Sequence, residues 1–276
     1  MNSEQARLLG VRAGKQMSPY LEICCLHLSA NVSYAKAQEE IVFLTGISVS
    51  ASTQQRLVQN YPFAKPTTGP QTPLKVANVD GGKVRVRTPE GEESSWRDYK
   101  AIATDRGAVA DFQNNASLID WVNQQARSTP ITCLGDGHDG VWNIVAEIAT
   151  APERREILDW FHLIENLYKV GGSLKRLSTA KTLLWRGKVD ETMALFTDLR
   201  SRQAHNFCKY LTKHRHRIVN YDDYQSEGIC PVGSGAVESA IKQIDRRIQI
   251  SGAQWNAENV PQVLAQRTAY INGILS

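Results

Sequence analysis

Three acidic residues lie where proteins hold divalent cations. Asp80 follows the alternating run LKVANV, Asp136 follows the apolar run ITCLG, and both are next to glycine. Glu238 lies on the first turns of a predicted helix, in GSGAVESAIK. Acids at strand ends have a rigid backbone and open space above them, which suits Mg²⁺. Because two such ions about 3.5–4 Å apart can cut phosphodiester bonds, we predict that Asp80, Asp136 and Glu238 are catalytic and hold two Mg²⁺ ions, with Mn²⁺ as a substitute.

The late helix explains how Glu238 can reach the other two acids. Apolar residues recur at i, i+4, i+7 and i+11 and predict a buried stripe of Val237, Ile241, Ile244 and Ile248. Glu238 lies at the border of this stripe, and Ser234 is a suitable N-cap. Taken singly, each acid has a plainer interpretation, because an aspartate before glycine is typical of a turn and a helical glutamate is typical of a solvated face. The three together favour a two-metal nuclease site.

Charge is distributed unevenly along the chain. The formal net charge is +4, yet residues 171–217 hold eleven Lys and Arg against three acids, and residues 71–150 have a net charge of −3. A basic segment beside an acidic one suits a protein that binds a polyanion and holds metal nearby; a solvated helical surface is the alternative. The residues predicted to contact nucleic acid are Lys242, Arg246, Arg247, Trp255, Arg200, Arg202, Lys213, Arg215 and Arg217. Trp255 would stack on a base, with packing in the core as the alternative.

Residues 74–170 predict an α/β core. Two alternating runs on either side of Gly81-Gly82, and then the run SWRDYKAIAT, predict three strands joined by tight turns. SLIDWVNQQAR predicts an amphipathic helix, ITCLGD a buried strand and VWNIVAEIA a helix. REILDWFH is either a fifth strand or the start of the helix HLIENLYKV. The order β-β-β-α-β-α-β is not that of a dinucleotide-binding fold, and no glycine-rich phosphate loop follows the first strand.

Helices are predicted on both sides of this core. Residues 1–62 contain helical runs that are separated by Gly46 and capped by Ser50 or Ser52, and they fit either a helix-turn-helix or a plain helical hairpin. Residues 63–73 hold three of the ten prolines and predict a linker. Residues 171–225 predict a basic, all-helical insertion. Residues 226–276 predict two further helices, the first of which carries Glu238 and completes the core.

The composition excludes several classes of protein. With 42% hydrophobic and 22% charged residues, the chain is globular rather than disordered. No run approaches the ~18–20 apolar residues of a membrane span, and the first residues are too polar for a secretory signal. The five cysteines lack the spacing of metal ligands, which indicates free thiols in a reducing compartment. We therefore expect a cytoplasmic protein without a membrane partner.

Four motifs of the chain are distinctive. They are VDGGKVRV, LGDGHDGVWN, ILDWFHLIENLY and PVGSGAVESAIKQIDRRIQISGAQW. Together they resemble the DDE transposases of bacterial insertion sequences, most closely the ISKra-type group, over about residues 18–270. The resemblance implies a ribonuclease H-like core, which is a mixed five-stranded sheet with helices, and a catalytic triad of Asp80, Asp136 and Glu238. The 102 positions between the last two acids match an all-helical insertion domain in such proteins.

The resemblance also implies the activity and the partners. A protein of this kind cleaves DNA at transposon ends, transfers the freed 3′-hydroxyl to target DNA, and acts as a homo-oligomer on DNA, associated with the nucleoid. Asp159 and His162 match a short Asp-x-x-His signature and are auxiliary candidates; a core strand followed by a helix-capping histidine is the alternative. Family members carry additional DNA-binding sequence at the N-terminus, so a truncated copy that binds DNA without cutting it is one alternative. A ribonuclease H-like nuclease that cuts branched DNA without joining is another.

Overall fold

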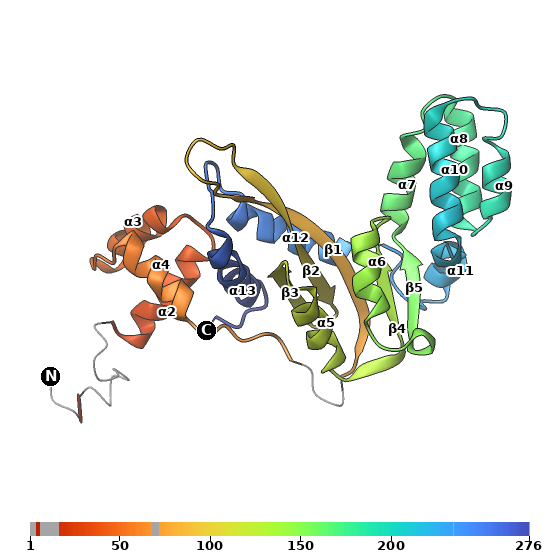
Figure 1. Cartoon of the computed structure of the whole chain (residues 1–276). Helices are drawn as coiled ribbons and strands as arrows, with labels where there is room; N and C mark the ends of the chain where they lie inside the picture. Colours follow the sequence, from red (N-terminus) through yellow and green to blue (C-terminus); the bar gives the residue numbers. More distant parts are fainter. Residues whose placement is uncertain (1–3, 6–16, 68–71, 234, 276) are drawn as a thin grey trace.

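A single mixed sheet forms the centre of this α/β protein (Figure 1); the computed structural model describes residues 4–5, 17–67, 72–233 and 235–275. The five strands are β1 (Leu74–Val86), β2 (Ser95–Thr104), β3 (Gly107–Phe112), β4 (Arg127–Gly135) and β5 (Arg154–Leu158). Their order in the sheet is β3-β2-β1-β4-β5. Strands β1, β2 and β3 pair antiparallel, whereas β4 pairs parallel with β1 and β5 pairs parallel with β4. The predicted mixed sheet of five strands, flanked by helices, is confirmed.

The first strand differs from the prediction. The sequence predicts a break at Gly81-Gly82, but β1 continues through both glycines and is 13 residues long. Gly81 pairs with Lys100, and Gly82 pairs with Tyr99. A Cβ atom on Gly82 would lie 2.4 Å from the ring of Tyr99, whose side chain is fully buried. The glycines therefore make room for side chains of the neighbouring strand rather than for a turn, and the third strand of the meander is β3, which the prediction missed.

Replacing Gly82 with alanine is expected to destabilise the fold by about 1–3 kcal/mol, because the added methyl group overlaps the Tyr99 ring. The ring is held in place, since its hydroxyl donates a hydrogen bond to Asp245 (2.9 Å). The measurement is the free energy of unfolding in urea. Gly235→Ala is the control, because a Cβ atom there meets nothing within 4 Å. Equal losses in the two variants would contradict the packing role of Gly82.

Helices cover both faces of the sheet (Figure 1). On one face, α5 (Asn115–Asn123) and α6 (Asp139–Ala146) pack with the sheet in one apolar core. On the other face, α12 (Gly235–Ile248) and α13 (Val260–Ile271) form a second apolar core with the sheet. The stripe predicted on α12 is buried in this second core, with at most 8% of any side chain exposed: Val237, Ile241, Ile244 and Ile248. Among the helices of the described residues, none combines the length and the apolar character needed to cross a membrane.

An all-helical region projects from the β5 edge of the sheet (Figure 1). It contains α7 (Trp160–Tyr168), α8 (Leu174–Trp185), α9 (Val189–Ala194), α10 (Arg202–His214), η2 (Arg215–Arg217) and α11 (Tyr221–Ser226). Both alternatives for REILDWFH are partly correct, because β5 ends at Leu158 and α7 begins at Trp160. The N–H of Trp160 donates a hydrogen bond to the carbonyl of Val232 (3.1 Å). The two ends of this helical region are therefore adjacent.

Within residues 17–67, three short helices precede the sheet. They are α2 (Pro19–Ser29), α3 (Tyr34–Thr45) and α4 (Ala51–Asn60). Gly46 ends α3 with a φ of +70°, and the side chain of Ser50 caps α4 by accepting a hydrogen bond from the N–H of Thr53. Ser52, the other predicted cap, lies inside α4. Residues 63–67 of the predicted linker have no regular structure, and residues 68–71 lie outside the described residues.

Two buried arginines hold α2 against the C-terminal helices by hydrogen bonds. Arg247 of α12 is 1% exposed, and its Nε donates a hydrogen bond to the carbonyl of Ser29 (2.6 Å). Arg267 of α13 is 5% exposed, and its Nη1 donates to the carbonyl of Ala30 (3.1 Å). Hydrogen bonds between buried polar groups favour one arrangement of the helices that carry them. The N-terminal helices are therefore docked on α12 and α13.

Two further short 3₁₀ helices are η1 (Ala151–Glu153) and η3 (Ala257–Asn259).

Candidate active site

Three parallel strands are in register at one edge of the sheet. Val79 of β1 pairs with Gly135 of β4, and Gly135 pairs with Leu158 of β5. The residue that follows each of these positions is an aspartate: Asp80, Asp136 and Asp159. Because neighbouring strands lie about 4.8 Å apart, the three aspartates lie side by side. The N–H of Asp159 also donates to the carbonyl of Gly135 (2.9 Å), which extends the pairing to this level.

Local hydrogen bonds hold the first two aspartates. Oδ1 of Asp80 accepts from the N–H of Gly81 (2.6 Å), and Oδ1 of Asp136 accepts from the N–H of His138 (2.8 Å). The indole N–H of Trp142 donates to the backbone carbonyl of Asp136 (2.7 Å), which ties the turn to α6. Carboxylates fixed in this way keep their positions for a ligand.

The predicted auxiliary pair is in direct contact. Asp159 is the N-cap of α7, and its Oδ1 accepts hydrogen bonds from the backbone N–H of His162 (2.8 Å) and from the ring Nδ1 (3.0 Å). The Asp159 side chain is fully buried, and that of His162 is 28% exposed. The three-residue spacing is that of a helix cap, but the capping side chain is Asp159 and not, as in the structural alternative, the histidine. The cap does not exclude a second role, because the capped ring belongs to a larger acidic group.

Glu238 joins this group from α12. One ligand atom from each of Asp159, His162 and Glu238 lies within 4.8 Å of the other two. The Glu238 side chain is 31% exposed, and its Oε2 lies 3.6 Å from Nζ of Lys242. Carboxylate oxygens suit hard divalent cations, and imidazole is a ligand for transition metals. The structure therefore supports a possible metal-binding group that contains the third predicted acid and the auxiliary pair.

Two pKa shifts connect this group with the first two aspartates. Burial raises the pKa of Asp80, and the negative charge of Asp136 raises it further. The hydrogen bond with Asp159 raises the pKa of His162 to about 9, and the charges of Asp159, Asp136 and Asp80 act in the same direction. The protonated ring is a counter-charge for several carboxylates at once. All four acids and the histidine therefore belong to one electrostatic cluster.

The His162 pKa makes the stability of the metal-free protein depend on pH. The folded value of about 9 lies above the ordinary value of 6.5, so the stabilisation is complete below about pH 6.5 and is lost as the pH rises through 9. Between about pH 6 and pH 10, in EDTA, we expect the wild type to lose about 2–3 kcal/mol more than His162→Gln. Urea unfolding at each pH measures this difference. Parallel pH curves for the two proteins would contradict it.

Two residues of the site have no signal in the sequence. Lys100 of β2 extends across Gly81, where a Cβ atom would lie 2.7 Å from its Nζ, and its charge opposes the raised pKa of Asp80. Tyr210 of α10 packs on Gly137, where a Cβ atom would lie 2.3 Å from the ring. Burial raises the pKa of Tyr210, and so do the nearby acids. Both side chains reach the site from elements that lie far from the acids in sequence.

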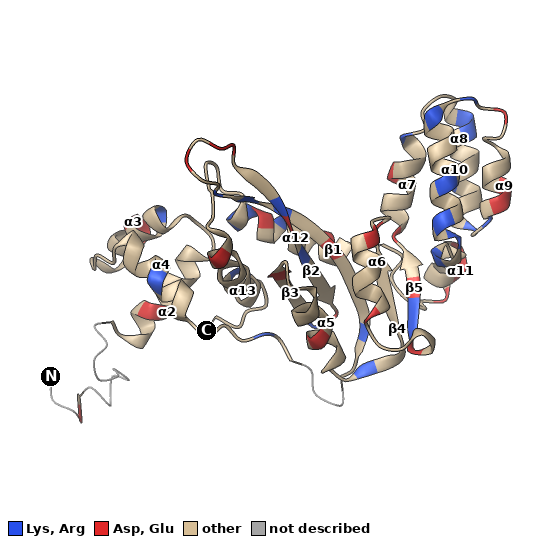
Figure 2. Ribbon diagram, in the orientation of Figure 1, with Lys and Arg blue, Asp and Glu red and all other residues tan. Residues whose placement is uncertain are grey.

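Four of the predicted cations lie on accessible surfaces. Lys242 and Arg246 line a surface hollow of about 370 Å³ on α12, together with Glu238. Arg200 and Arg202 are exposed at the start of α10. Figure 2 shows further basic residues along α8 and α10, on the region that projects from the sheet. This placement is compatible with a path for a polyanion from the acids to the helical insertion.

Three other predicted cations form ion pairs within the protein. The pairs are Lys213–Asp139, Arg215–Asp190 and Arg217–Glu156. Arg217 makes two such contacts: its Nε donates to Glu156 (2.8 Å), and its guanidinium lies 3.8 Å from the centre of the Trp142 ring. Its side chain is 15% exposed. Arg217 therefore holds the insertion to the core and is poorly placed for the predicted DNA contact.

Arg247 and Trp255 lie toward the end of α12 that is remote from Glu238. Arg247 is 1% exposed, so its predicted contact with DNA cannot involve a double helix that lies on the surface. Trp255 is half-buried, and its indole N–H donates to the carbonyl of Ile248 (2.8 Å). The structure thus does not bring these two side chains to the acidic cluster. Ser234, the predicted cap of α12, lies outside the described residues.

Comparison of the chain with known protein families gives no match, and comparison with curated proteins gives none either.

Proposed function

We propose that this chain is a DDE transposase of the ISKra-type group, which cuts DNA at transposon ends and joins the freed 3′-hydroxyl to target DNA. The observation that carries the proposal is the clustering of acids at one edge of the sheet. Asp80 and Asp136 follow register-matched positions of parallel strands, and Glu238 reaches the neighbouring pair of Asp159 and His162 from α12. The mixed five-stranded sheet with flanking helices is compatible with the ribonuclease H-like fold that the motifs imply.

The acids have distinct tasks in this proposal. Asp80 and Asp136 bind the divalent cations, and Glu238 completes the site. Two bound Mg²⁺ or Mn²⁺ ions would activate the attacking oxygen and stabilise the leaving one. Asp159 orients the ring of His162, which balances the charge of the acids until a cation replaces it. The carboxylates repel one another, as the raised pKa of Asp80 indicates, and a bound divalent cation would reduce this repulsion.

DNA is the proposed partner of the basic surfaces. Lys242 and Arg246 lie next to Glu238 and can neutralise phosphates on either side of the bond that is cut. The exposed cations of α8 and α10 extend this surface along the insertion. The protein would assemble as a homo-oligomer on the two transposon ends, in the cytoplasm.

Purified protein with Mg²⁺ or Mn²⁺ and labelled DNA from the sequences that flank the gene tests the proposal. We expect nicks at defined positions, followed by joined products, and neither in EDTA nor with Asp136→Asn. DNA binding without any nicking would favour the truncated, inactive copy. Cutting of branched DNA without joining would favour a ribonuclease H-like nuclease.

A further inference from the structure

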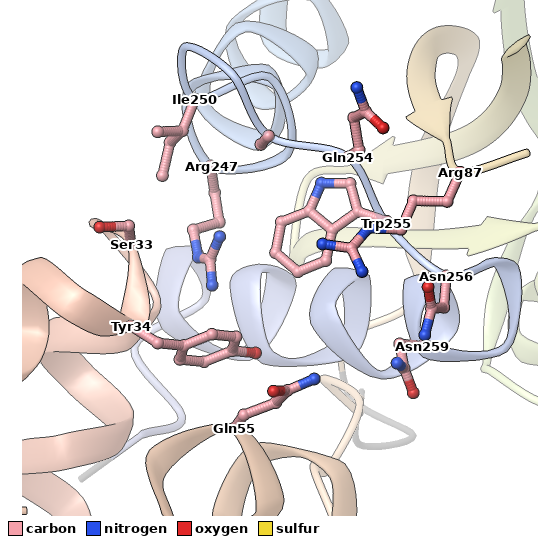
Figure 3. Close-up of a pocket in the computed structure, with 11 residues that line it drawn as sticks. Ser33, Tyr34, Gln55, Arg87, Arg247, Ile250, Gln254, Trp255, Asn256 and Asn259 are labelled. Carbon is pink, nitrogen blue, oxygen red and sulfur yellow. The ribbon is translucent and has the colours of Figure 1, made fainter. Parts of the chain in front are cut away.

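A pocket at the far end of α12 is not used by the proposed reaction. It lies where α3, α4, the end of β1 and the segment after α12 meet (Figure 3), and its volume is about 250 Å³. Pockets that bind drug-sized ligands enclose about 300–1,000 Å³, whereas one water takes about 30 Å³. The pocket therefore suits a ligand smaller than a drug but much larger than a solvent molecule.

The charged groups of the pocket are all positive. Of the described residues that line it, none is acidic and two are arginines, Arg87 and Arg247. The Arg247 guanidinium lies 5.0 Å from the centre of the Tyr34 ring and 4.8 Å from that of Trp255, and Figure 3 shows it between them. The guanidinium interacts with the Tyr34 hydroxyl, and its buried Nη2 has no hydrogen-bond partner among the described residues. A buried cation with an unused donor favours a ligand that brings an acceptor or a negative charge.

The neutral groups of the pocket indicate that the ligand is more than a bare anion. Four amide side chains line it: Gln55, Gln254, Asn256 and Asn259. Each amide both donates and accepts, and a phosphate offers almost only acceptors. The edge of a nucleobase offers donors and acceptors together. The ring of Trp255 adds a planar surface, on which bases of any sequence stack.

The backbone around the pocket is held firmly. The N–H of Arg87 donates to the carbonyl of Trp255 (2.9 Å), and the N–H of Trp255 donates to the carbonyl of Arg85 (3.0 Å). These bonds add the segment after α12 to the end of β1 as a short parallel pairing. The Trp255 ring, whose N–H also donates to the carbonyl of Ile248, is therefore positioned before any ligand arrives, and the exposed side chain of Arg87 starts beside it.

We infer that this pocket binds one unpaired nucleotide of a DNA strand, with the base against Trp255 and the amides, an acceptor of the base toward Nη2 of Arg247, and the phosphate at Arg87. That the ligand belongs to DNA rests on the proposed function. Arg247 lies nine positions after Glu238 on α12, which is a rise of about 14 Å along the helix. The nucleotide is therefore held away from the reacting phosphate, where it anchors the strand.

The test is the binding of labelled single strands to the full chain in EDTA, where no cleavage occurs. The two probes are a strand of ten thymidines and a strand of ten abasic deoxyribose phosphates. We expect the thymidine strand to bind about tenfold more tightly, because one stacked base contributes on that scale. Equal binding of the two strands by the wild type overturns the inference.

Variants of residues that line the pocket show whether the effect arises there. Asn256→Ala with Gln55→Ala, and separately Trp255→Leu, should each remove most of the preference for thymidine. If Trp255→Leu does not fold, the double variant decides. A preference that survives in the double variant and in any folded Trp255→Leu overturns the inference.

The charge contribution needs its own control. Arg87→Gln should weaken binding of both DNA probes several-fold more than Lys83→Gln, which removes a charge from β1, four positions earlier and outside the pocket. Thymidine 5′-monophosphate should compete with the labelled strand better than inorganic phosphate. Equal competition would show a site for anions alone and would overturn the inference, as would equal effects of the two charge variants.

Failure of the proposed function gives a different result. A wild type that binds neither strand and no duplex contradicts the proposed function itself. A wild type that nicks and joins duplex DNA but shows no preference between the strands contradicts only the nucleotide pocket. Asp136→Asn should lose cleavage and keep the preference, since the two sites lie apart.

Discussion

Asp136→Asn is expected to lower metal-dependent DNA cleavage by at least about a hundredfold and to leave the fold intact. Asp80→Asn and Glu238→Gln should behave in the same way, because each removes one negative charge and nearly preserves the shape of the side chain. Without metal, the three variants should be as stable as the wild type or slightly more stable, since the charge of Asp136 already raises the pKa of Asp80. The measurements are nicking rates with Mg²⁺ and urea unfolding in EDTA.

The response to metal separates a metal site from a structural acid. Mn²⁺ should raise the melting temperature of the wild type and raise it less in each variant, because a cation that binds only the folded state stabilises it. DNA binding in EDTA should persist in all three variants. A substitution that unfolds the protein, or one that leaves nicking and joining intact, would remove that acid from the proposed triad.

Replacing Arg202 and Lys209 with glutamine is expected to weaken binding to all DNA sequences alike. The two residues are seven positions apart on α10 and therefore lie on one face of the helix. Each lost phosphate contact should reduce the slope of the logarithm of affinity against the logarithm of salt concentration by about 0.9. Filter binding of duplex DNA over a range of salt concentrations measures the change.

Lys75 and Arg106 provide the matched control. Both are exposed cations, and both lie near the end of β1 that is remote from Asp80. Their replacement by glutamine removes the same charge from the protein and should leave the slope nearly unchanged. Equal slopes in the two double variants would show that the α10 surface does not contact DNA and is a solvated helical face.

The sequence predicts those parts of the fold that depend on local periodicity. The apolar run of β4 and the stripe on α12 are correct because burial on one face imposes a repeat that is visible in the residues themselves. The break at Gly81-Gly82 is wrong because the reason for these glycines is a tertiary contact, the Tyr99 ring that lies against Gly82. Local glycine signals do not distinguish a turn from a close approach.

The same distinction applies to the residues of the sites. Asp80 and Asp136 are predictable because strand ends beside glycine are visible in the sequence, whereas Asp159 and His162 are singled out only by their match to a short Asp-x-x-His signature. The burial of Arg247 is not predictable, since its hydrogen-bond acceptor is the carbonyl of Ser29, 218 positions away. Lys100 and Tyr210 reach the acids only through the packing of β2 and α10.

The hydrogen bond between Trp160 and Val232 has a consequence for how such proteins diverge. Because the helical region leaves and rejoins the core at one point, its length can change without stretching the sheet or moving α12. Closing a loop twice as long costs only about 0.6 kcal/mol of chain entropy. The number of residues between Asp136 and Glu238 can therefore vary among related proteins, whereas the arrangement of the acids in space cannot. Relatives of this chain are better sought by the order of their strand ends than by the spacing of their acids.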